Sequence, residues 1–330
     1  MKSLIITLSA IALTTMTLVF LSQNSDSSMR KEFMEFKSQY NKSYGSKTEL
    51  EYRFSIFAEN MNMIKLSNAN KDKRFTLKKN QFSDKTFEEF KNQFLMVPQE
   101  NEAHHLVSLS SPVSGNVDWR TVRGAIGAIK NQKECGSCWA FSSVASMETA
   151  YFLRNQKFVS FSEQELVDCA SSYGNHGCNG GLMPFAFEYI MDNKITTEEA
   201  YPYRAFEGTC RASSMSERYS MDSFAQINPI DVEGLKLGIK ETVVSVAIEV
   251  QHDFMFYNGG VYHADSNCGQ ALNHAVNAVG FNTETSDPYF IVRNSWGPTW
   301  GLGGYVKMAI ASGSGTCGIA NPTCTFPVYA

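Results

Sequence analysis

The 330-residue sequence lacks the features that would place it in several common classes. It has no internal repeats, no stripe rich in Lys and Arg, and beyond residue 21 no apolar run long enough to cross a bilayer. These absences exclude a repeat architecture and a chain-wide surface built for nucleic acid, so no nucleic-acid partner is expected. The composition, 43% hydrophobic and 19% charged, is that of an ordinary globular chain and excludes wholesale disorder.

Cysteine is missing from one part of the chain and concentrated in another. Residues 22–112 contain no cysteine and hold 14 basic and 12 acidic residues, a net charge of +2. Residues 113–330 contain all eight cysteines and hold 14 basic and 21 acidic residues, a net charge of −7. This contrast predicts two separately built pieces. Residues 100–115 between them are Ser-rich with few charges, which indicates an exposed linker where proteolytic nicking is expected.

The amino terminus has the pattern of a secretory signal. Lys2 precedes an uncharged, mostly apolar run over residues 4–21. A retained signal anchor is the alternative, because the run reaches the lower limit of a membrane span and no small-x-small cleavage site follows it. We expect a signal peptide over residues 1–22, and in either case the rest of the chain enters an oxidising compartment where disulfides persist.

The cysteine-free segment is predicted to be helical, with helices over residues 30–40, 47–70 and 85–94 and a short strand over 75–77. Six side chains of the second helix follow one another at steps of 4, 4, 3, 4 and 4, which places them on one helical face. These six are Glu49, Arg53, Phe57, Asn60, Ile64 and Asn68. Such a polar and apolar mixture favours a docking face, although an ordinary amphipathic helix is the simpler alternative.

The body, residues 113–330, is predicted to have helices first and strands second. A buried helix is expected over residues 138–154, and Ser162 with Glu165 has the capping-box spacing of a second helix start. The strands are predicted over residues 243–250, 274–281, 288–294 and 303–309. This order indicates an α+β body of two halves, and a cleft between two such halves is a natural place for a site.

Cys135 and Cys138 form a C-x-x-C pair that has three interpretations. A redox pair is disfavoured by the six further cysteines of a chain in an oxidising compartment. A zinc site is disfavoured because no second C-x-x-C or H-x₃₋₅-H completes it. The third interpretation uses the predicted helix, whose N-terminus favours a thiolate at Cys138. Cys138 is then a candidate nucleophile and Cys135 a candidate disulfide partner.

A nucleophilic cysteine needs a base, and the base needs a group that orients it. His274 opens a predicted apolar strand, whereas the other five histidines lie in predicted loops and turns. A lone histidine at such a place is more often structural. Asn294 at the end of the next predicted strand strengthens the case, because its side-chain oxygen can bond one imidazole nitrogen and leave the other facing the thiol. Trp296 and Trp300 either cover that bond or simply pack in the core.

These motifs resemble the papain-like cysteine protease family, and in particular its cathepsin L-like subgroup. The C-G-S-C-W run from Cys135 to Trp139, with a downstream His and Asn, carries the resemblance. The six-residue stripe resembles the E-R-F-N-I-N pattern of cathepsin L-type propeptides. N-Q-F-S-D resembles the second propeptide motif, with Lys78 where the family has Gly. V-D-W-R, G-C-N-G-G, N-H-A-V and N-S-W-G extend the match over nearly the whole chain after the signal.

The resemblance implies an α+β, papain-like two-lobed fold with a helical lobe, a β-barrel-like lobe and the active-site cleft between them. It implies a signal peptide (1–22), a helical inhibitory propeptide (23–112, here called the leader) and a peptidase domain (113–330). The leader would inhibit its own peptidase by running through the cleft until the chain is cut near residues 110–113. We expect a monomeric endopeptidase acting on proteins and peptides in a lysosome, another acidic vesicle or outside the cell, without stable membrane association.

The resemblance also assigns catalytic roles. The Cys138 thiolate would attack the peptide carbonyl, the His274 imidazolium would protonate the leaving amine, and Asn294 would orient His274. Gln132, with the backbone N–H of Cys138, would stabilise the oxyanion. Lys133 departs from the family glycine at its position, which adds a charge beside the cleft. No cofactor and no metal ion are expected, and a catalytically silent relative would lack one of these residues.

Substrate binding is expected along an apolar surface. Gly180 and Gly181 would allow the substrate backbone to approach closely, and Trp296 is counted with the substrate-binding residues. The pocket for the second residue before the cut would be lined entirely by apolar side chains, those of Leu182, Met183, Ala247, Leu272, Ala275 and Pro322. Such a pocket predicts a preference for Leu, Val or Phe at that substrate position.

Family analogy also accounts for most of the cysteines and for one modification. It implies the disulfides Cys135–Cys178, Cys169–Cys210 and Cys268–Cys317. Cys324 is then left over, either as a buried free thiol or as an intermolecular partner. Asn41 begins the one N-x-[ST] sequon of the chain and lies in the leader, so the mature enzyme should carry no N-linked glycan.

Overall fold

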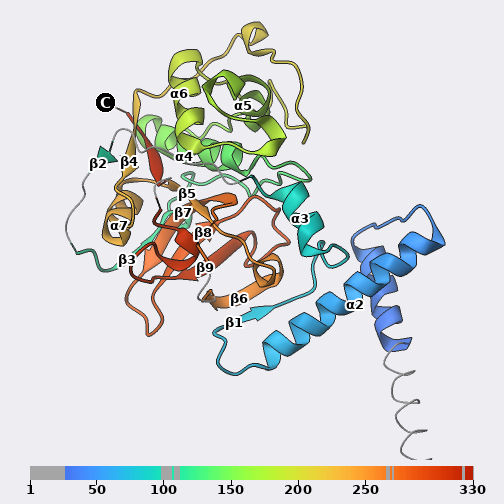
Figure 1. The fold of residues 1–330 in the computed structure, drawn as a ribbon. Coiled ribbons are helices and arrows are strands. Elements are labelled where there is room, and N and C mark those ends of the chain that lie inside the picture. Colours follow the sequence, from blue (N-terminus) through green and yellow to red (C-terminus); the bar gives the residue numbers. More distant parts are fainter. Residues whose placement is uncertain are drawn as a thin grey trace, which may run out of the picture. The chain divides into compact units, whose positions relative to one another are not determined.

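The structure is a computed structural model that describes residues 27–97, 106–107, 112–264, 268–269, 271–321 and 324–329 (Figure 1). The predicted signal peptide, most of the predicted linker and Pro322 lie outside the described residues. The chain divides into two compact units. The first holds the described residues up to Leu66 together with Gln81–Thr86, and the second holds Ser67–Asn80 and the chain from Phe87 onward. Among the described residues, none of the helices is both long and apolar enough to cross a membrane.

The first unit is built on a helix over residues 27–39 and on most of α2 (Lys47–Ala69). Phe33 and Phe36 lie three apart on the first helix, and Phe54 and Phe57 lie three apart on α2, so each pair shares one face. All four rings are buried, and the Phe57 ring lies 5.3 Å from Phe33 and 5.0 Å from Phe36 between centroids. This aromatic cluster holds the two helices together.

The predicted polar stripe of α2 binds other parts of the leader. Arg53 donates to the backbone oxygen of Asp84 (3.1 Å), and Asn60 donates to the carbonyls of Ser83 and Lys85 (both 3.0 Å). Further along the helix, the Asn68 side chain makes two hydrogen bonds with the backbone of Leu77. These polar side chains therefore fix the loop and the short strand that follow the helix within the leader.

The second unit contains a ten-stranded sheet in the order β1-β6-β9-β8-β7-β5-β10-β4-β2, with β3 paired to β7. The β6–β9 and β2–β4 pairs are parallel, and the other pairs are antiparallel. The strands are β1 (Phe75–Leu77), β2 (Leu106–Val107), β3 (Asn116–Asp118), β4 (Ser223–Ile227), β5 (Val244–Ile248), β6 (Tyr257–Tyr262), β7 (His274–Asn282), β8 (Tyr289–Arg293), β9 (Tyr305–Ala309) and β10 (Thr325–Val328). β2 lies inside the segment that was expected to be an irregular linker.

The helices α4, α5 and α6 lie together on one side of the strands β5, β7, β8 and β9, whereas α7 lies apart from them beside β4 (Figure 1). α4 is buried along most of its length, as expected for its near-continuous apolar sequence, and it contacts β7, α5 and α6. The helices are α3 (Phe87–Phe94), α4 (Cys138–Asn155), α5 (Glu163–Cys169), α6 (Met183–Asn193) and α7 (Val232–Glu241). Short 3₁₀ helices span Trp119–Thr121, Ala170–Tyr173, Gly177–Asn179, Ala212–Ser214, Asp253–Phe256 and Thr316–Gly318. The predicted α+β fold with a helical lobe and a sheet lobe is confirmed.

Two local predictions differ from the structure in detail. The strand predicted from residue 303 begins at Tyr305, because Gly303 and Gly304 adopt positive φ angles of 65° and 92° that end an extended strand. Ser162 caps α5 as expected, accepting from the Glu165 backbone N–H at 3.0 Å. The capping box is incomplete, however, because the Ser162 N–H donates to the carbonyl of Thr196 and not to the Glu165 carboxylate.

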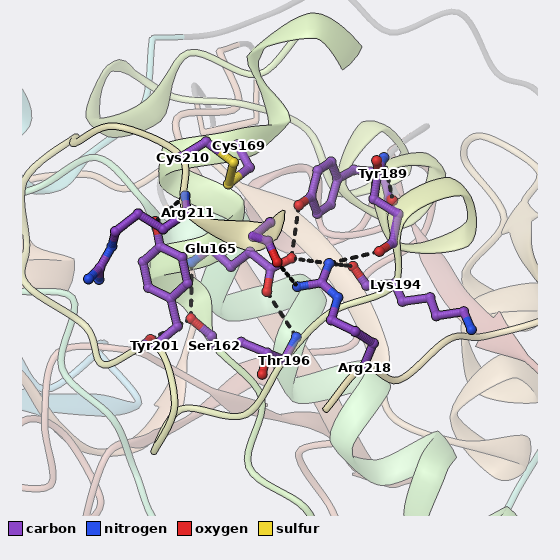
Figure 2. A network of polar contacts seen from close by, with 12 residues as sticks. Ser162, Glu165, Cys169, Tyr189, Lys194, Thr196, Tyr201, Cys210, Arg211 and Arg218 are labelled. Atoms are coloured by element: carbon purple, nitrogen blue, oxygen red, sulfur yellow. Dashed lines mark hydrogen bonds and ion pairs between the residues drawn. A yellow bond between two sulfur atoms is a disulfide. The ribbon is translucent and has the colours of Figure 1, made fainter. Parts of the chain in front are cut away.

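The Glu165 carboxylate is instead the centre of a buried polar network (Figure 2). It is fully buried and accepts from Arg218 (2.6 Å), from the Tyr189 hydroxyl (2.8 Å) and from the Thr196 backbone N–H (2.9 Å). A buried charge needs such partners, because an unpaired one is costly to remove from water. The network ties α5 to α6 and to the segments around Thr196 and Arg218.

Candidate active site

Cys138 is the first residue of α4, directly after the N-cap residue Ser137. The preceding loop is held by the Cys135–Cys178 disulfide and by a hydrogen bond from Gly136 N to the Cys178 carbonyl (2.8 Å). A Cβ on Gly136 would lie 2.4 Å from that carbonyl oxygen, so glycine is required where the two loops touch. Because Cys135 is bonded to Cys178, it does not form a redox pair with Cys138.

His274 and Asn294 are brought together by antiparallel strands. His274 begins β7 and Asn294 directly follows β8, so the start of one strand lies beside the end of the other. His274 Nε2 and Asn294 Oδ1 are 2.8 Å apart, and both side chains are buried. The Trp296 ring stacks on the imidazole with centroids 4.6 Å apart, and Trp300 meets Trp296 edge-on at 5.1 Å. The Trp296 ring therefore covers the buried imidazole of His274, and Trp300 packs against Trp296.

The second imidazole nitrogen is left free for a different partner. His274 Nδ1 has no hydrogen bond to any group in the described part of the chain. Cys138 is a buried free thiol, packed in the same cluster as Ala275, the residue next to His274. This arrangement suits proton transfer between a thiol and an imidazole.

Burial holds both groups in their neutral forms. It raises the pKa of Cys138 to about 11, against hydrogen bonds from neighbouring backbone groups that lower it. Burial also lowers the pKa of His274 to about 4, partly offset by the hydrogen bond to Asn294. With the leader in place, burial therefore favours the thiol and the neutral imidazole, against the preference of the helix N-terminus for a thiolate.

Gln132 reaches a peptide carbonyl of the leader. Its Nε2 donates to the carbonyl oxygens of Phe94 and Cys135, both at 2.8 Å. Ser295 Oγ donates to Gln132 Oε1 at 2.6 Å, which fixes the amide so that its NH₂ group points toward Phe94. Ser295 was not singled out from the sequence, although it directly follows Asn294 in the N-S-W-G motif.

The leader continues past Phe94 along the predicted substrate-binding residues. Met96 N donates to the Asn273 carbonyl (2.8 Å), and Val97 N donates to the Asn179 carbonyl (3.3 Å). Gly180 has a φ of +126°, and a Cβ there would lie 2.9 Å from the Met96 Cβ. Glycine is therefore required for the leader backbone to lie this close.

The Met96 side chain lies in the same buried apolar cluster as several residues of the predicted pocket. It is 3% exposed and packs in one buried cluster with Met183, Ala247 and Ala275, against which Leu272 also packs. Ala247 and Ala275 are direct partners in the β5–β7 ladder, which explains why residues 28 positions apart line the same pocket. Pro322 lies outside the described residues.

The remaining predicted substrate residues border this region. Leu182 is buried as the N-cap residue of α6, and its N–H donates to Asn175 Oδ1 (2.8 Å). That amide oxygen would lie 2.2 Å from a Cβ on Gly181, so Asn175 requires glycine there. Trp296 also meets Phe90 of the leader edge-on, with centroids 5.0 Å apart. Neither Asn175 nor Phe90 was marked as a site residue by the sequence, because no local motif distinguishes them.

A buried charged cluster lies behind Asn294. Lys130 Nζ bonds Glu148 (2.8 Å) and Glu163 (2.7 Å), and a cavity of about 10 Å³, enough for one water molecule, is lined by these three residues together with Asn294. Burial, with Glu148 and Glu198 nearby, raises the pKa of Glu163 to about 8 against the attraction of Lys130. This shift favours the protonated form of Glu163 at neutral pH, beside the ion pair of Lys130 with Glu148.

The described cysteines comprise three disulfides and two free thiols. The disulfides join Cys135–Cys178, Cys169–Cys210 and Cys268–Cys317, the pairs that the resemblance implies. Cys324 is buried, its Sγ lies 3.1 Å from the carbonyl of Ile319, and burial raises its pKa. It is thus a buried free thiol in this structure, the first of the two alternatives left open by the sequence.

Comparison with known proteins identifies the family. Residues 113–326 match the model of the papain family cysteine protease, and residues 33–90 match the cathepsin propeptide inhibitor domain (I29). The chain is 39% identical to fruit bromelain of Ananas comosus over 302 residues (88% of this chain, 84% of bromelain). It is 38% identical to a cathepsin L-like peptidase of Aedes aegypti over 311 residues (88% of this chain, 91% of the relative).

Solved structures agree with these matches. A recombinant stem bromelain precursor superposes with a TM-score of 0.84 at 34% identity, covering 91% of this chain and 99% of the precursor. Digestive procathepsin L 3 of the Tenebrio molitor larval midgut gives 0.82 at 35% identity, with the same coverage of both chains. The chain therefore belongs to the papain family of cysteine proteases, as a cathepsin L-like zymogen with its own propeptide inhibitor domain.

Proposed function

We propose that the protein is an endopeptidase that hydrolyses peptide bonds through a Cys138 thiolate and a His274 imidazolium. The observation that carries this proposal is the hydrogen bond from Gln132 Nε2 to the Phe94 carbonyl. A peptide carbonyl lies against an amide donor in the part of the cleft that also holds Cys138 and the His274–Asn294 pair. A substrate carbonyl at the same place would lie where both the nucleophile and the oxyanion donor can act.

In the first half-reaction, Cys138 Sγ adds to the substrate carbonyl carbon. The negative charge that develops on oxygen is stabilised by Gln132 Nε2 and the Cys138 backbone N–H. His274 then gives its proton to the amine as the carbon–nitrogen bond breaks, leaving an acyl-thioester. A water molecule, deprotonated by His274, hydrolyses this thioester, which releases the Cys138 thiolate and restores the thiolate–imidazolium pair. Asn294 keeps the imidazole ring in the required orientation throughout.

The leader inhibits this chemistry by lying in the cleft in the opposite direction to a substrate. Gln132 touches the carbonyl of residue 94, and the apolar pocket holds the side chain of residue 96. In a substrate, the pocket residue comes before the carbonyl that is attacked, whereas here it comes after. The backbone of Met96 in the leader also contacts Cys138, and both Cys138 and His274 are buried while the leader is present, which favours their neutral forms. Both effects block turnover while the leader is bound.

The pocket is expected to select apolar side chains such as Leu, Val, Phe or Met at the second position before the cut. Met96 supports this preference, because its unbranched apolar side chain lies in the same buried cluster as Met183, Ala247 and Ala275 of the proposed pocket. Fluorogenic dipeptide substrates test it, with Phe-Arg expected to be cleaved faster than Arg-Arg by the mature enzyme. Faster cleavage of Arg-Arg would contradict the proposed preference.

We also propose the order of processing and its setting. The signal (1–22) is removed in the secretory pathway, and the leader (23–112), glycosylated at Asn41, is removed in an acidic vesicle or outside the cell to leave monomeric residues 113–330. The backbone of Val113 supports this boundary, because its N–H donates to Glu233 (2.7 Å) and its carbonyl accepts from Lys236 (2.7 Å). Gel analysis of purified zymogen at pH 4–5 and at pH 7 tests acid triggering, which equal persistence at both would refute.

The catalytic assignment is tested with Cys138→Ser. The variant zymogen cannot mature itself, so a trace of wild-type enzyme is added to remove its leader and is then separated. We expect the matured variant to lose peptidase activity by several orders of magnitude, while Cys324→Ser keeps it, because Cys324 is buried away from the cleft residues. Peptidase activity of matured Cys138→Ser equal to that of the wild type would overturn the assignment.

A further inference from the structure

We propose that the edge of β6 on which the leader strand β1 lies becomes, in the mature protease, an exosite for protein substrates. The partner is an extended substrate segment with two basic residues, an aromatic residue, any residue and an apolar residue in succession. This inference rests on the proposed function, since it assigns a second contact surface to the same peptidase. The leader segment Lys73–Leu77 serves as the template for the partner.

The leader strand adds to the sheet through backbone hydrogen bonds. β1 pairs antiparallel with β6, with Phe75 opposite Gly260, Thr76 opposite Gly259 and Leu77 opposite Tyr257. Hydrogen bonds from Val261 N to the Arg74 carbonyl (3.0 Å) and from Lys78 N to the Phe256 carbonyl (2.8 Å) extend the pairing at both ends. These bonds do not depend on the side chains of the added strand, so another extended chain can make them.

Gly260 allows the backbone of an added strand to come close to β6. It has a φ of +84°, and a Cβ there would lie 2.3 Å from the Arg74 carbonyl oxygen and 2.8 Å from the Phe75 Cα. Any other residue would therefore push the added strand away. Because Gly260 belongs to the peptidase domain, this edge of β6 remains in the mature enzyme after the leader is lost.

An aromatic contact selects the third residue of the segment. The Phe75 ring is 4% exposed and lies 4.7 Å from the Tyr262 ring between centroids. Tyr262 is held in place by the Phe254 ring at 5.1 Å and by its hydroxyl, which donates to Asp253 Oδ1 (2.8 Å). Leu77, two residues after Phe75 on the same face of the strand, is 3% exposed. Two alternate side chains of the docked strand are thus buried, and one of them, Phe75, packs on Tyr262.

Two carboxylates of the protease select the basic residues. Lys73 Nζ lies 3.1 Å from Asp253 Oδ2, and Arg74 lies 3.1 Å from Asp287 Oδ1. The second interaction includes His263, whose Nε2 lies 3.0 Å from both oxygens of Asp287. Removal of the leader takes away both cations and leaves the carboxylates beside an open strand edge. That combination favours an incoming extended segment with positive charge.

Binding is tested with a peptide of residues 70–79 and the matured Cys138→Ser protein, which cannot cleave it. Fluorescence anisotropy should show binding that is weakened by about tenfold or more when Lys73 and Arg74 of the peptide are both replaced by Glu. Replacing Phe75 of the peptide by Ala should weaken it similarly. These changes are made in the peptide, so they cannot disturb the fold of the protease. Equal binding of the native and Glu-substituted peptides would overturn the proposal.

Kinetics with the active mature enzyme provide the second test. An internally quenched Phe-Arg substrate is joined by Gly/Ser linkers of several lengths to Lys-Arg-Phe-Thr-Leu or to a scrambled version of it. With a linker of suitable length, KM should be lower by about tenfold for the native segment, with kcat unchanged, because docking raises the local concentration of the cleavage site. Asp253→Asn with Asp287→Asn should remove the advantage but leave cleavage of the short Phe-Arg substrate unaltered.

The outcomes separate this proposal from the proposed function. The exosite is refuted if the short Phe-Arg substrate is cleaved normally but substrates linked to the native and scrambled segments have the same KM at every linker length. The proposed peptidase function is unaffected by that result. If Phe-Arg is not cleaved by the mature enzyme, the proposed function itself fails. Asn at position 253 can still accept from the Tyr262 hydroxyl, so the paired variant keeps that contact within the protease.

Discussion

At the scale of single residues, the hydrogen bond between Ser295 and Gln132 decides which atom of the amide faces the cleft. Because Ser295 Oγ donates to Oε1, Nε2 is left to donate to a carbonyl bound in the cleft. The asymmetry matters, since an amide turned the other way would present oxygen to a developing oxyanion and destabilise it. Gln132 is fully buried under the leader, so this orientation exists before any substrate binds.

We therefore expect Gln132→Ala to act on the transition state more than on substrate binding. Loss of one oxyanion donor should lower kcat of the mature enzyme by about a hundredfold with a much smaller change in KM. Steady-state kinetics on a Phe-Arg substrate measure both constants, and thermal unfolding checks that the variant is folded. A large rise in KM at unchanged kcat would instead indicate a role in ground-state binding.

Sequence motifs predict the candidate catalytic residues better than they predict the leader residues that lie against them. Cys138, His274 and Asn294 stand out because each has a chemical type and a place at the end of a predicted element. Met96 carries no such mark, and its position in the apolar pocket depends on how α3 leads the chain into the cleft. Such placement arises from contacts between distant segments, which no local pattern encodes.

At the scale of elements, α5 has most of its polar side chains buried. Glu163, Gln164, Glu165 and Asp168 lie on a helix of seven residues, and all four are buried. Glu165 is paired with Arg218, whose side chain is 16% exposed, and Arg218 also bonds the carbonyls of Asn193 and Lys194. The helix is thus fixed by ion pairs and hydrogen bonds in addition to apolar packing.

Removal of Arg218 should consequently destabilise the protein. Arg218→Ala leaves the Glu165 carboxylate buried without its cation, and we expect a loss of about 3 kcal/mol in the free energy of unfolding. Urea denaturation of the zymogen measures this loss. Arg211→Ala is the matched control, since its guanidinium interacts with the uncharged Tyr201 side chain, over whose ring it lies at 4.6 Å, and its loss should cost less than about 1 kcal/mol. Equal effects of the two substitutions would contradict this account.

The segment after α3 is the element that closes the cleft, and Met96 is its anchor. Met96→Asp would place a charge in an apolar pocket, so the leader should bind more weakly and the zymogen should mature faster. The rate of conversion seen on gels at a fixed zymogen concentration measures the effect. Met96→Leu, which fits an apolar pocket of similar size, should mature at the wild-type rate. An unchanged rate for the Asp variant would remove Met96 from the inhibitory contact.

Strand predictions failed where the strands are short or contain unfavourable residues. β10 contains Pro327 and β6 contains Gly259 and Gly260, residue types that are depleted in strands. Their strand structure comes from pairing with neighbours that are distant in sequence, as with β10 and β4. The pairing of β1 with β6 could not be predicted from the sequence either, because the two strands are distant in the chain. The strand β1 itself was predicted.

At the scale of the whole molecule, the buried charges couple stability to pH. The pKa of Glu163 is about 8 in the folded protein and ordinary, near 4.5, in the unfolded chain. Between these values the folded state binds one more proton than the unfolded state, so stability falls as pH rises from about 4.5 to about 8. Lys130 remains charged over this range, because the neighbouring Glu148 carboxylate raises its pKa against the opposing effect of burial.

Glu163→Gln isolates this contribution, because a neutral amide replaces a carboxyl group that is already neutral when folded. We expect the wild-type urea midpoint to be lower at pH 8 than at pH 5, and the difference to shrink by the equivalent of at least about 1 kcal/mol in the variant. Measurements on the same zymogen preparation at both pH values provide the comparison. An identical pH difference in the two proteins would show that Glu163 does not hold the proton.

The reversed direction of the leader has a consequence for the time course of maturation. A chain that lies backwards in its own cleft is a bound ligand that its host cannot turn over, so the first cut should come from a second molecule whose cleft is already open. Activation should then be autocatalytic, with a lag that shortens as the zymogen is made more concentrated and disappears when a trace of mature enzyme is added. The rate of activation would thus depend on the local concentration of the zymogen, and a sufficiently dilute zymogen would stay inactive.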